Sequence, residues 1–203
     1  MADDAERHHR QSVRLQGYNY SQPGMYFVTI CTNERELLFG EIMEGKMMVN
    51  QTGRIVEEEW LKTPDIRPFV ALDEFVVMPN HLHGVLVFTD TSIHFVGAHS
   101  CAPLRQTRLQ RPPRSLGSLI AGFKSATTTR VNELRGALGI PLWQRNYHEH
   151  VIRNEEDLRR IREYIQTNPL RWELDRENPA RRGEDEFDRW LASLSPKGNR
   201  AKK

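Results

Sequence analysis

Cysteine and long apolar segments are scarce in this sequence. Only Cys31 and Cys101 occur among 203 residues, and they are not in C-x-x-C spacing, which argues against a disulfide scaffold or a zinc-thiolate site. No apolar run approaches the roughly 20 residues that cross a membrane. Residues 1–11 lack the apolar core and the cleavage site of a secretory signal. We therefore expect a protein of the reducing cytoplasm with no membrane partner.

The length and composition are those of one globular domain with tails. The chain is 38% hydrophobic and 28% charged, and 203 residues fall near the size of a single domain. We expect an N-terminal tail over residues 1–16 and a domain over residues 17–178. Residues 91–113 are expected to form a loop insertion in this domain. Residues 179–203 are expected to form a C-terminal extension, partly disordered.

The charges are unevenly placed, although the net charge is only +2. Residues 104–135 hold seven basic residues and one acid, a local charge of +6, whereas acids predominate in residues 173–189. A concentrated basic stretch suggests a polyanionic partner, and a solvated surface is an equally good explanation on charge alone. The candidate contacts are Arg105, Arg108, Arg111, Arg114, Lys124 and Arg130.

The hydrophobic patterns predict an α+β protein. Strands are indicated at residues 24–32, 70–78, 81–88 and 142–153, and helices at 51–61, 115–134 and 154–167. Their order is β-α-β-β-α-β followed by an additional helix. This is the ferredoxin-like arrangement, in which an antiparallel sheet carries helices on one face.

Two histidines and a tyrosine could perform chemistry. His81 and His83 are two residues apart on a predicted strand, so their side chains leave the same face and could bind one ion, although chance gives an H-x-H quite often. Tyr164 and Asn168 are four residues apart and share a helix face. Alternatively, Tyr164 is a core aromatic and Asn168 ends the helix. Imidazole nitrogen with amide oxygen suits Mg²⁺ or Mn²⁺, and a tyrosine beside such an ion suggests attack on a phosphodiester.

An ordered set of short motifs resembles the REP-associated tyrosine transposases, single-tyrosine HUH nucleases that act on single-stranded DNA. The set extends over about residues 17–178, and its P-N-H-x-H element is fairly specific. Its members are Gly17-Tyr18-Asn19-Tyr20, Tyr26 to Thr32, Met78-Pro79-Asn80-His81-Leu82-His83, Gly122-Phe123-Lys124-Ser125, Trp143-Gln144-Arg145, Glu149-His150-Val151-Ile152-Arg153, Tyr164-Ile165, Asn168-Pro169 and Trp172.

The resemblance implies a role for each matching residue. His81 and His83 would be the metal ligands, Tyr164 the nucleophile, and Asn168 a third, polar ligand on the helix of the tyrosine. The ion would be Mg²⁺ or Mn²⁺. Glu149 and His150 match a stretch whose role does not follow from the residues, and His148 stands where an aromatic residue is expected.

The implied activity is cleavage and rejoining of single-stranded, hairpin-containing DNA through a 5′-phosphotyrosine intermediate, in transposition at the nucleoid. The bond energy is kept in the intermediate, so no nucleotide cofactor is expected, and no P-loop occurs. Two other functions remain open: a non-catalytic single-strand-binding module with a ferredoxin-like sheet, and a small metallohydrolase that uses metal-bound water. The sequence fits a monomer or a homodimer.

Overall fold

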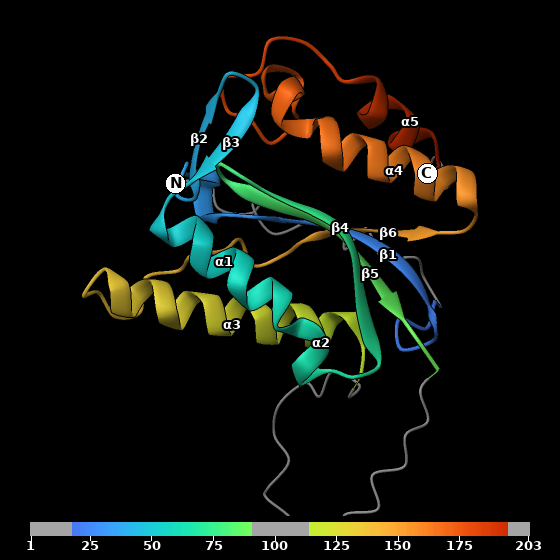
Figure 1. Cartoon of the computed structure of the whole chain (residues 1–203), viewed down its shortest axis with the longest axis horizontal. Helices are drawn as coiled ribbons and strands as arrows, with labels where there is room; N and C mark the ends of the chain where they lie inside the picture. Colours follow the sequence, from blue (N-terminus) through green and yellow to red (C-terminus); the bar gives the residue numbers. More distant parts are fainter. Residues whose placement is uncertain (1–17, 91–113, 195–203) are drawn as a thin grey trace, which may run out of the picture.

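The computed structural model describes residues 18–90 and 114–194. A four-stranded antiparallel sheet has the order β4-β5-β1-β6, and a separate β2–β3 ribbon lies at one end of it (Figure 1). The elements are β1 (Gly24–Cys31), η1 (Asn33–Arg35), β2 (Gly40–Met43), β3 (Lys46–Val49), α1 (Gln51–Leu61), α2 (Thr63–Ile66), β4 (Val70–Met78), β5 (His81–Phe88), α3 (Leu116–Leu134), β6 (His148–Ile152), α4 (Glu155–Thr167), η2 (Asn168–Leu174) and α5 (Glu186–Leu194). The predicted α+β class and antiparallel sheet are confirmed.

Helices cover both faces of the sheet (Figure 1). Helices α1 and α3 pack against each other on one face, with α2 beside them. The opposite face carries α4, which contacts β4, and α5 lies beside α4. The additional helix of the sequence prediction is α4, and it covers the face that the other two predicted helices leave open. This placement explains why β5 is buried on both of its faces.

Side-chain caps fix where the three long helices begin. Asn50 accepts a hydrogen bond from the backbone of Gly53 at the start of α1, and Ser115 does the same for Ser118 in α3. Asn154 caps α4, whose first turn contains three acids that favour the positive end of the helix dipole. These three helices therefore begin where the sequence predicts them.

Two parts of the chain differ from the sequence prediction. The strand expected at residues 142–153 is interrupted: it is present as β6 and as an isolated bridge between Trp143 and Thr32. Between them, Lys124 donates to the carbonyl oxygens of Gln144 and Asn146 instead. The β2–β3 ribbon was not predicted. Its turn residues Glu44 and Gly45 both have positive φ (50° and 72°), a favoured hairpin geometry.

Among the described residues, none of the helices is both long and apolar enough to cross a membrane.

Candidate functional site

Strand β5 presents His81 and His83 on the face of the sheet that α4 covers. Their ring centroids lie 4.3 Å apart, and the two residues are 0% and 2% exposed. Leu82, between them, points into the core on the opposite face. The alternation predicted from the sequence is therefore present, and it places two imidazoles side by side in a buried environment.

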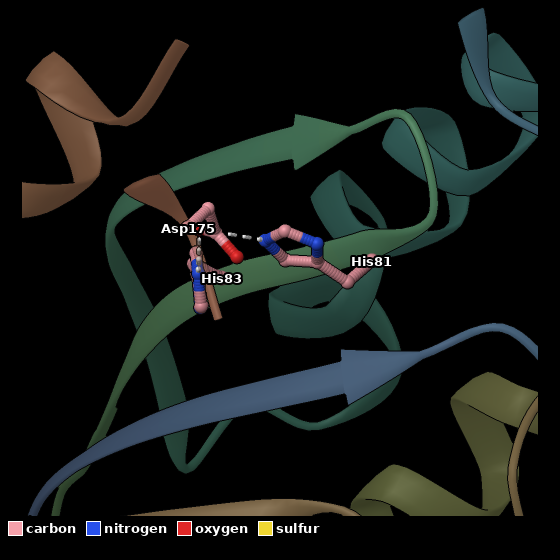
Figure 2. Close-up of side chains that lie close together, drawn as sticks. All are labelled: His81, His83 and Asp175. Atoms are coloured by element: carbon pink, nitrogen blue, oxygen red, sulfur yellow. Dashed lines mark ion pairs between the residues drawn. The ribbon is translucent and has the colours of Figure 1, made fainter. Parts of the chain in front are cut away.

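Asp175 completes a group of three potential metal ligands. It follows η2, and its Oδ2 atom lies 3.7 Å from the Nε2 atoms of both His81 and His83. Figure 2 shows the carboxyl group facing both rings. The three ligand atoms all lie within 4.8 Å of one another, and all three residues are buried. This group could hold a metal ion.

Further residues orient the two imidazoles. The Nδ1 atom of His81 lies 2.8 Å from Oδ1 of Asn80, and Nδ1 of His83 lies 2.9 Å from the hydroxyl of Thr29. With the hydrogens on Nδ1, both Nε2 lone pairs are free to face Asp175, the arrangement usual for metal-binding histidines. Asn80 is itself fixed, because its amide donates to the carbonyl oxygens of Arg35 and Glu177.

Two buried polar atoms lack a hydrogen-bond partner among the described residues at this point. They are Nε2 of His81 and the side-chain oxygen of Asn168. Buried polar groups nearly always have a partner, so atoms without one indicate a missing ligand. Both belong to residues at the His-His-Asp group, and nitrogen with carboxylate and amide oxygen can bind a divalent cation. The residues present therefore fit a metal ion.

Helix α4 and the start of η2 bring Tyr164 and Asn168 to the same group. The Tyr164 hydroxyl lies 3.3 Å from Nε2 of His83 and donates to Oδ2 of Asp175 at 3.1 Å. The Asn168 amide donates to the same oxygen at 2.7 Å. All the residues that the sequence analysis proposed as ligands or nucleophile thus lie together, and Asp175 joins them.

The surroundings of Tyr164 keep its hydroxyl protonated. Burial, followed by the charge of Asp175, raises the pKa of Tyr164 well above its ordinary value. Its ring is 2% exposed and stacks on Phe187 of α5, with ring centroids 3.8 Å apart and an angle of 8° between the planes. The hydroxyl is held in place but is not ionised.

The ligand group combines a neutral His81 imidazole with the negative charge of Asp175. Burial and the neighbouring His83 lower the pKa of His81 to about 3. Burial alone would raise the pKa of Asp175, but hydrogen bonding and charge from His83 and His81 and the Asn168 amide hold it below its usual range. Unprotonated imidazoles and an ionised carboxylate are the forms that bind metal.

The residues left uncertain by the sequence line a cavity beside Tyr164. His148, Glu149 and His150 of β6 contribute to this cavity of about 250 Å³, and Tyr164 and His83 line it too. Burial lowers the pKa of both His148 and His150. Their proximity to Tyr164 could not be read from the sequence.

The basic residues are less closely connected with this site. Arg105, Arg108 and Arg111 lie outside the described residues, and Arg114 lies over the ring of Phe69. Lys124 and Arg130 belong to α3, on the opposite face of the sheet (Figure 1). Arg130 pairs with Glu58 and Glu59 at 2.6 and 2.7 Å. Their role in DNA binding stays a prediction.

Sequence reasoning did not identify Asp175. It lies in the acid-rich stretch of residues 173–189, where its neighbour Glu173 is exposed, and no motif or spacing distinguishes a buried acid from an exposed one. The only available signal was the turn at Asn168-Pro169, which ends α4 and lets the chain return toward the helix.

Comparisons with known proteins identify a relative at the level of sequence. No protein-family model matches the chain. An uncharacterized protein of Haemophilus influenzae is 41% identical over 172 residues, covering 83% of this chain and 92% of that protein. The chain belongs to the same family as this protein.

Two solved structures are similar in fold. One is a REP-associated tyrosine transposase bound to a REP hairpin, with 20% identity, a TM-score of 0.49, and coverage of 76% of this chain and 72% of that one. The other is a candidate transposase from Deinococcus radiodurans, with 16% identity, a TM-score of 0.43, and coverage of 75% and 95%. Likenesses at this level carry no argument about chemistry, which rests on the geometry of the site.

Proposed function

We propose that the protein is a metal-dependent single-stranded DNA nuclease and strand transferase in which Tyr164 is the nucleophile. One observation carries this proposal: the Tyr164 hydroxyl lies 3.3 Å from His83 and 3.1 Å from Asp175, within a buried group that could hold a metal ion. A nucleophile next to an ion site is the arrangement needed for attack on a phosphodiester.

His81, His83 and Asp175 would hold Mg²⁺ or Mn²⁺, with the side-chain oxygen of Asn168 as a further ligand. When bound, the ion would supply positive charge that polarises the scissile phosphate and compensates the charge of Asp175. Thr29 and Asn80 would keep the imidazole rings oriented. Phe187 would hold the Tyr164 ring by stacking.

The reaction would exchange one phosphodiester for another. The Tyr164 oxygen forms a bond to phosphorus, the bond to the DNA 3′-oxygen breaks, and the proton of the tyrosine ends on the released 3′-hydroxyl. The product is a 5′-phosphotyrosine, and attack by a second 3′-hydroxyl reverses the step and joins a new end. Because the number of ester bonds is unchanged, no nucleotide cofactor is needed.

The substrate we propose is a single DNA strand that contains a hairpin, as the motif resemblance implies. The two competing functions make different demands on the site. A non-catalytic binding module has no use for a tyrosine hydroxyl among potential metal ligands. A metallohydrolase that uses metal-bound water gives products without a covalent protein–DNA species.

The test is a denaturing gel of the protein incubated with Mn²⁺ and labelled hairpin DNA drawn from a randomised pool. We expect a protein–DNA adduct that survives denaturation. Tyr164→Phe should abolish it without loss of fold or DNA affinity, because only a hydroxyl is removed and stacking on Phe187 is kept.

The matched control is Tyr147→Phe, which removes a hydroxyl from a partly buried tyrosine outside the ligand group. This variant should form the adduct normally. An adduct that persists in Tyr164→Phe and disappears in Tyr147→Phe would assign the nucleophile to Tyr147. Cleavage without any adduct would favour the metallohydrolase.

A further inference from the structure

The cavity beside Tyr164 contains polar groups that the proposed reaction does not use. We call it the β6 cavity and define it by Phe27, His148, His150, Arg176, Phe187 and Asp188. Its volume of about 250 Å³ lies below the 300–1,000 Å³ typical of pockets for drug-sized ligands, so it suits one small group.

Strand register relates the cavity to the reacting atoms. His148 is paired with Thr29 on β1, and Thr29 is paired with His83 on β5, so these three residues form a row across the sheet. Two strand spacings amount to about 10 Å. The cavity therefore extends along the sheet from the site of the Tyr164 hydroxyl toward the edge strand β6.

Two buried atoms in the cavity lack a hydrogen-bond partner among the described residues. They are Nε2 of His150 and Oδ2 of Asp188. Because buried polar groups rarely remain unpaired, the pair indicates a ligand with hydrogen-bonding groups of its own. The rest of the lining is mixed. It includes the aromatic rings of Phe27 and Phe187 and the apolar Leu191, together with the polar residues Thr29, His83, His148, Glu149 and Tyr164.

Arg176 adds a positive charge to the same cavity. Its Nε atom donates to Glu177 at 2.9 Å, and its two terminal nitrogens form no hydrogen bond or ion pair with the described part of the chain. A guanidinium group with free N–H groups binds phosphate well. The cavity thus combines a phosphate-binding cation, two aromatic rings and the two polar atoms of His150 and Asp188 that lack a partner among the described residues.

From this combination we infer that the β6 cavity binds the nucleotide next to the scissile phosphate of a single DNA strand. Its base would lie against Phe27 and Phe187 with its polar edge toward His150 and Asp188, and its phosphate would lie at Arg176. This inference rests on the proposed function. A base can reach His150 and Asp188 with its hydrogen-bonding edge only when that edge is unpaired. The cavity would therefore select unpaired DNA and distinguish among bases at one position.

The test is a binding experiment in EDTA, where no cleavage occurs, so the result does not depend on the nuclease activity. The tightest-binding hairpin strand selected from a randomised pool is compared with a series of strands that each lack one base. For the natural protein, we expect loss of one particular base beside the hairpin to weaken binding about tenfold, the usual effect of removing one stacked base.

The variant carrying His150→Ala and Asp188→Ala should bind the intact strand about tenfold more weakly and should no longer respond to loss of that base. Ala192→Trp fills the cavity from its exposed rim without removing a packed side chain, so it should give the same result even if the double variant folds poorly. Arg189→Gln, an exposed change on the same helix, should keep the tenfold response.

The inference is wrong if removal of the base still weakens binding about tenfold in the double variant and in Ala192→Trp, because the base and the cavity would then act independently. It is also wrong if the natural protein responds to no single base. If the protein forms the adduct but the base and the cavity act independently, the proposed nuclease function stands and the inference about the cavity is wrong. If the cavity substitutions abolish the response to the missing base but no adduct ever forms, the inference about the cavity stands and the proposed nuclease function is wrong.

Discussion

The two faces of the central sheet are built from the same strands but bury different side chains. On the face that carries α1 and α3, β5 contributes Leu82 and Leu86 to a continuous apolar core that includes Trp60. On the face that carries α4, the alternate residues His81 and His83 meet a carboxylate, and apolar packing is confined to a smaller cluster around Tyr164. One strand thus serves stability on one face and chemistry on the other.

The comparison indicates how a buried polar group can be tolerated. Burying three ionisable side chains costs free energy unless each has partners. Here Asn80, Thr29 and Asn168 supply them, while the opposite face contributes apolar burial that does not depend on the site. Changes on the α4 face should therefore alter chemistry more than stability, and changes on the α1 face should do the reverse.

The largest expected effect is that of Asp175→Asn. The amide keeps the size of the side chain but removes the only negative charge in the ligand group. Adduct formation should fall more than about 100-fold, since loss of even an outer-shell partner of a metal often costs 10- to 100-fold. The rise in melting temperature on adding Mn²⁺, which metal binding should give the natural protein, should disappear.

The control for this change is Asp185→Asn. Asp185 is as buried as Asp175, at 1% exposure, but it pairs with Arg171 and the backbone of Phe187 instead of the histidines. Its loss should lower the melting temperature and leave the response to Mn²⁺. Equal responses of the two variants to Mn²⁺ would place the ion elsewhere.

The second effect concerns the α1 face and compares two added methyl groups. A Cβ atom at Gly84 would lie 2.5 Å from Cζ2 of Trp60, whose side chain is fully buried. Gly84→Ala should lower the free energy of unfolding by about 1–3 kcal/mol, as overpacking does. The rate of adduct formation per folded molecule should change less than twofold, because the methyl group points away from His81 and His83.

Gly122→Ala is the matched change in α3. Its Cβ would meet only the end of the flexible Arg67 side chain, at 3.0 Å, and alanine favours a helix over glycine by up to about 1 kcal/mol. Urea denaturation should therefore show unchanged or higher stability. If Gly84→Ala instead left stability intact and abolished the adduct, the division of roles between the two faces would be wrong.

The sequence predicted what depends on neighbours along the chain. Alternation placed His81 and His83 on one face, and the hydrophobic patterns marked the three helices that Asn50, Ser115 and Asn154 cap in the structure. Each of these signals acts over a few residues, so it is readable without the fold.

What could not be predicted depends on segments far apart. Asp175 reaches His81 only because η2 turns the chain back after α4, and Tyr164 meets His83 across 81 residues of sequence. The place of α5 over Tyr164 is of the same kind, since residues 179–203 appeared only as an extension. The motif resemblance supplied His81, His83, Asn168 and Tyr164 together, but it did not include the carboxylate.

The smallest expected effect separates the basic residues of α3 from those at positions 105–114. Removing one phosphate-binding cation from a single-strand complex should flatten the plot of log affinity against log salt concentration by about 0.7. Arg130 is held by Glu58 and Glu59 on the face opposite to the site, so Arg130→Gln should leave the slope unchanged and cost at most about 1 kcal/mol of stability, as for other surface ion pairs. Replacing Arg105, Arg108, Arg111 and Arg114 together should flatten the slope if this segment follows the DNA, with little change in sequence preference, because phosphate contacts do not read bases. The opposite result, in which Arg130→Gln flattens the slope and the fourfold variant does not, would place the DNA on the α1 face. The assignment of chemistry to the α4 face alone would then lose its basis.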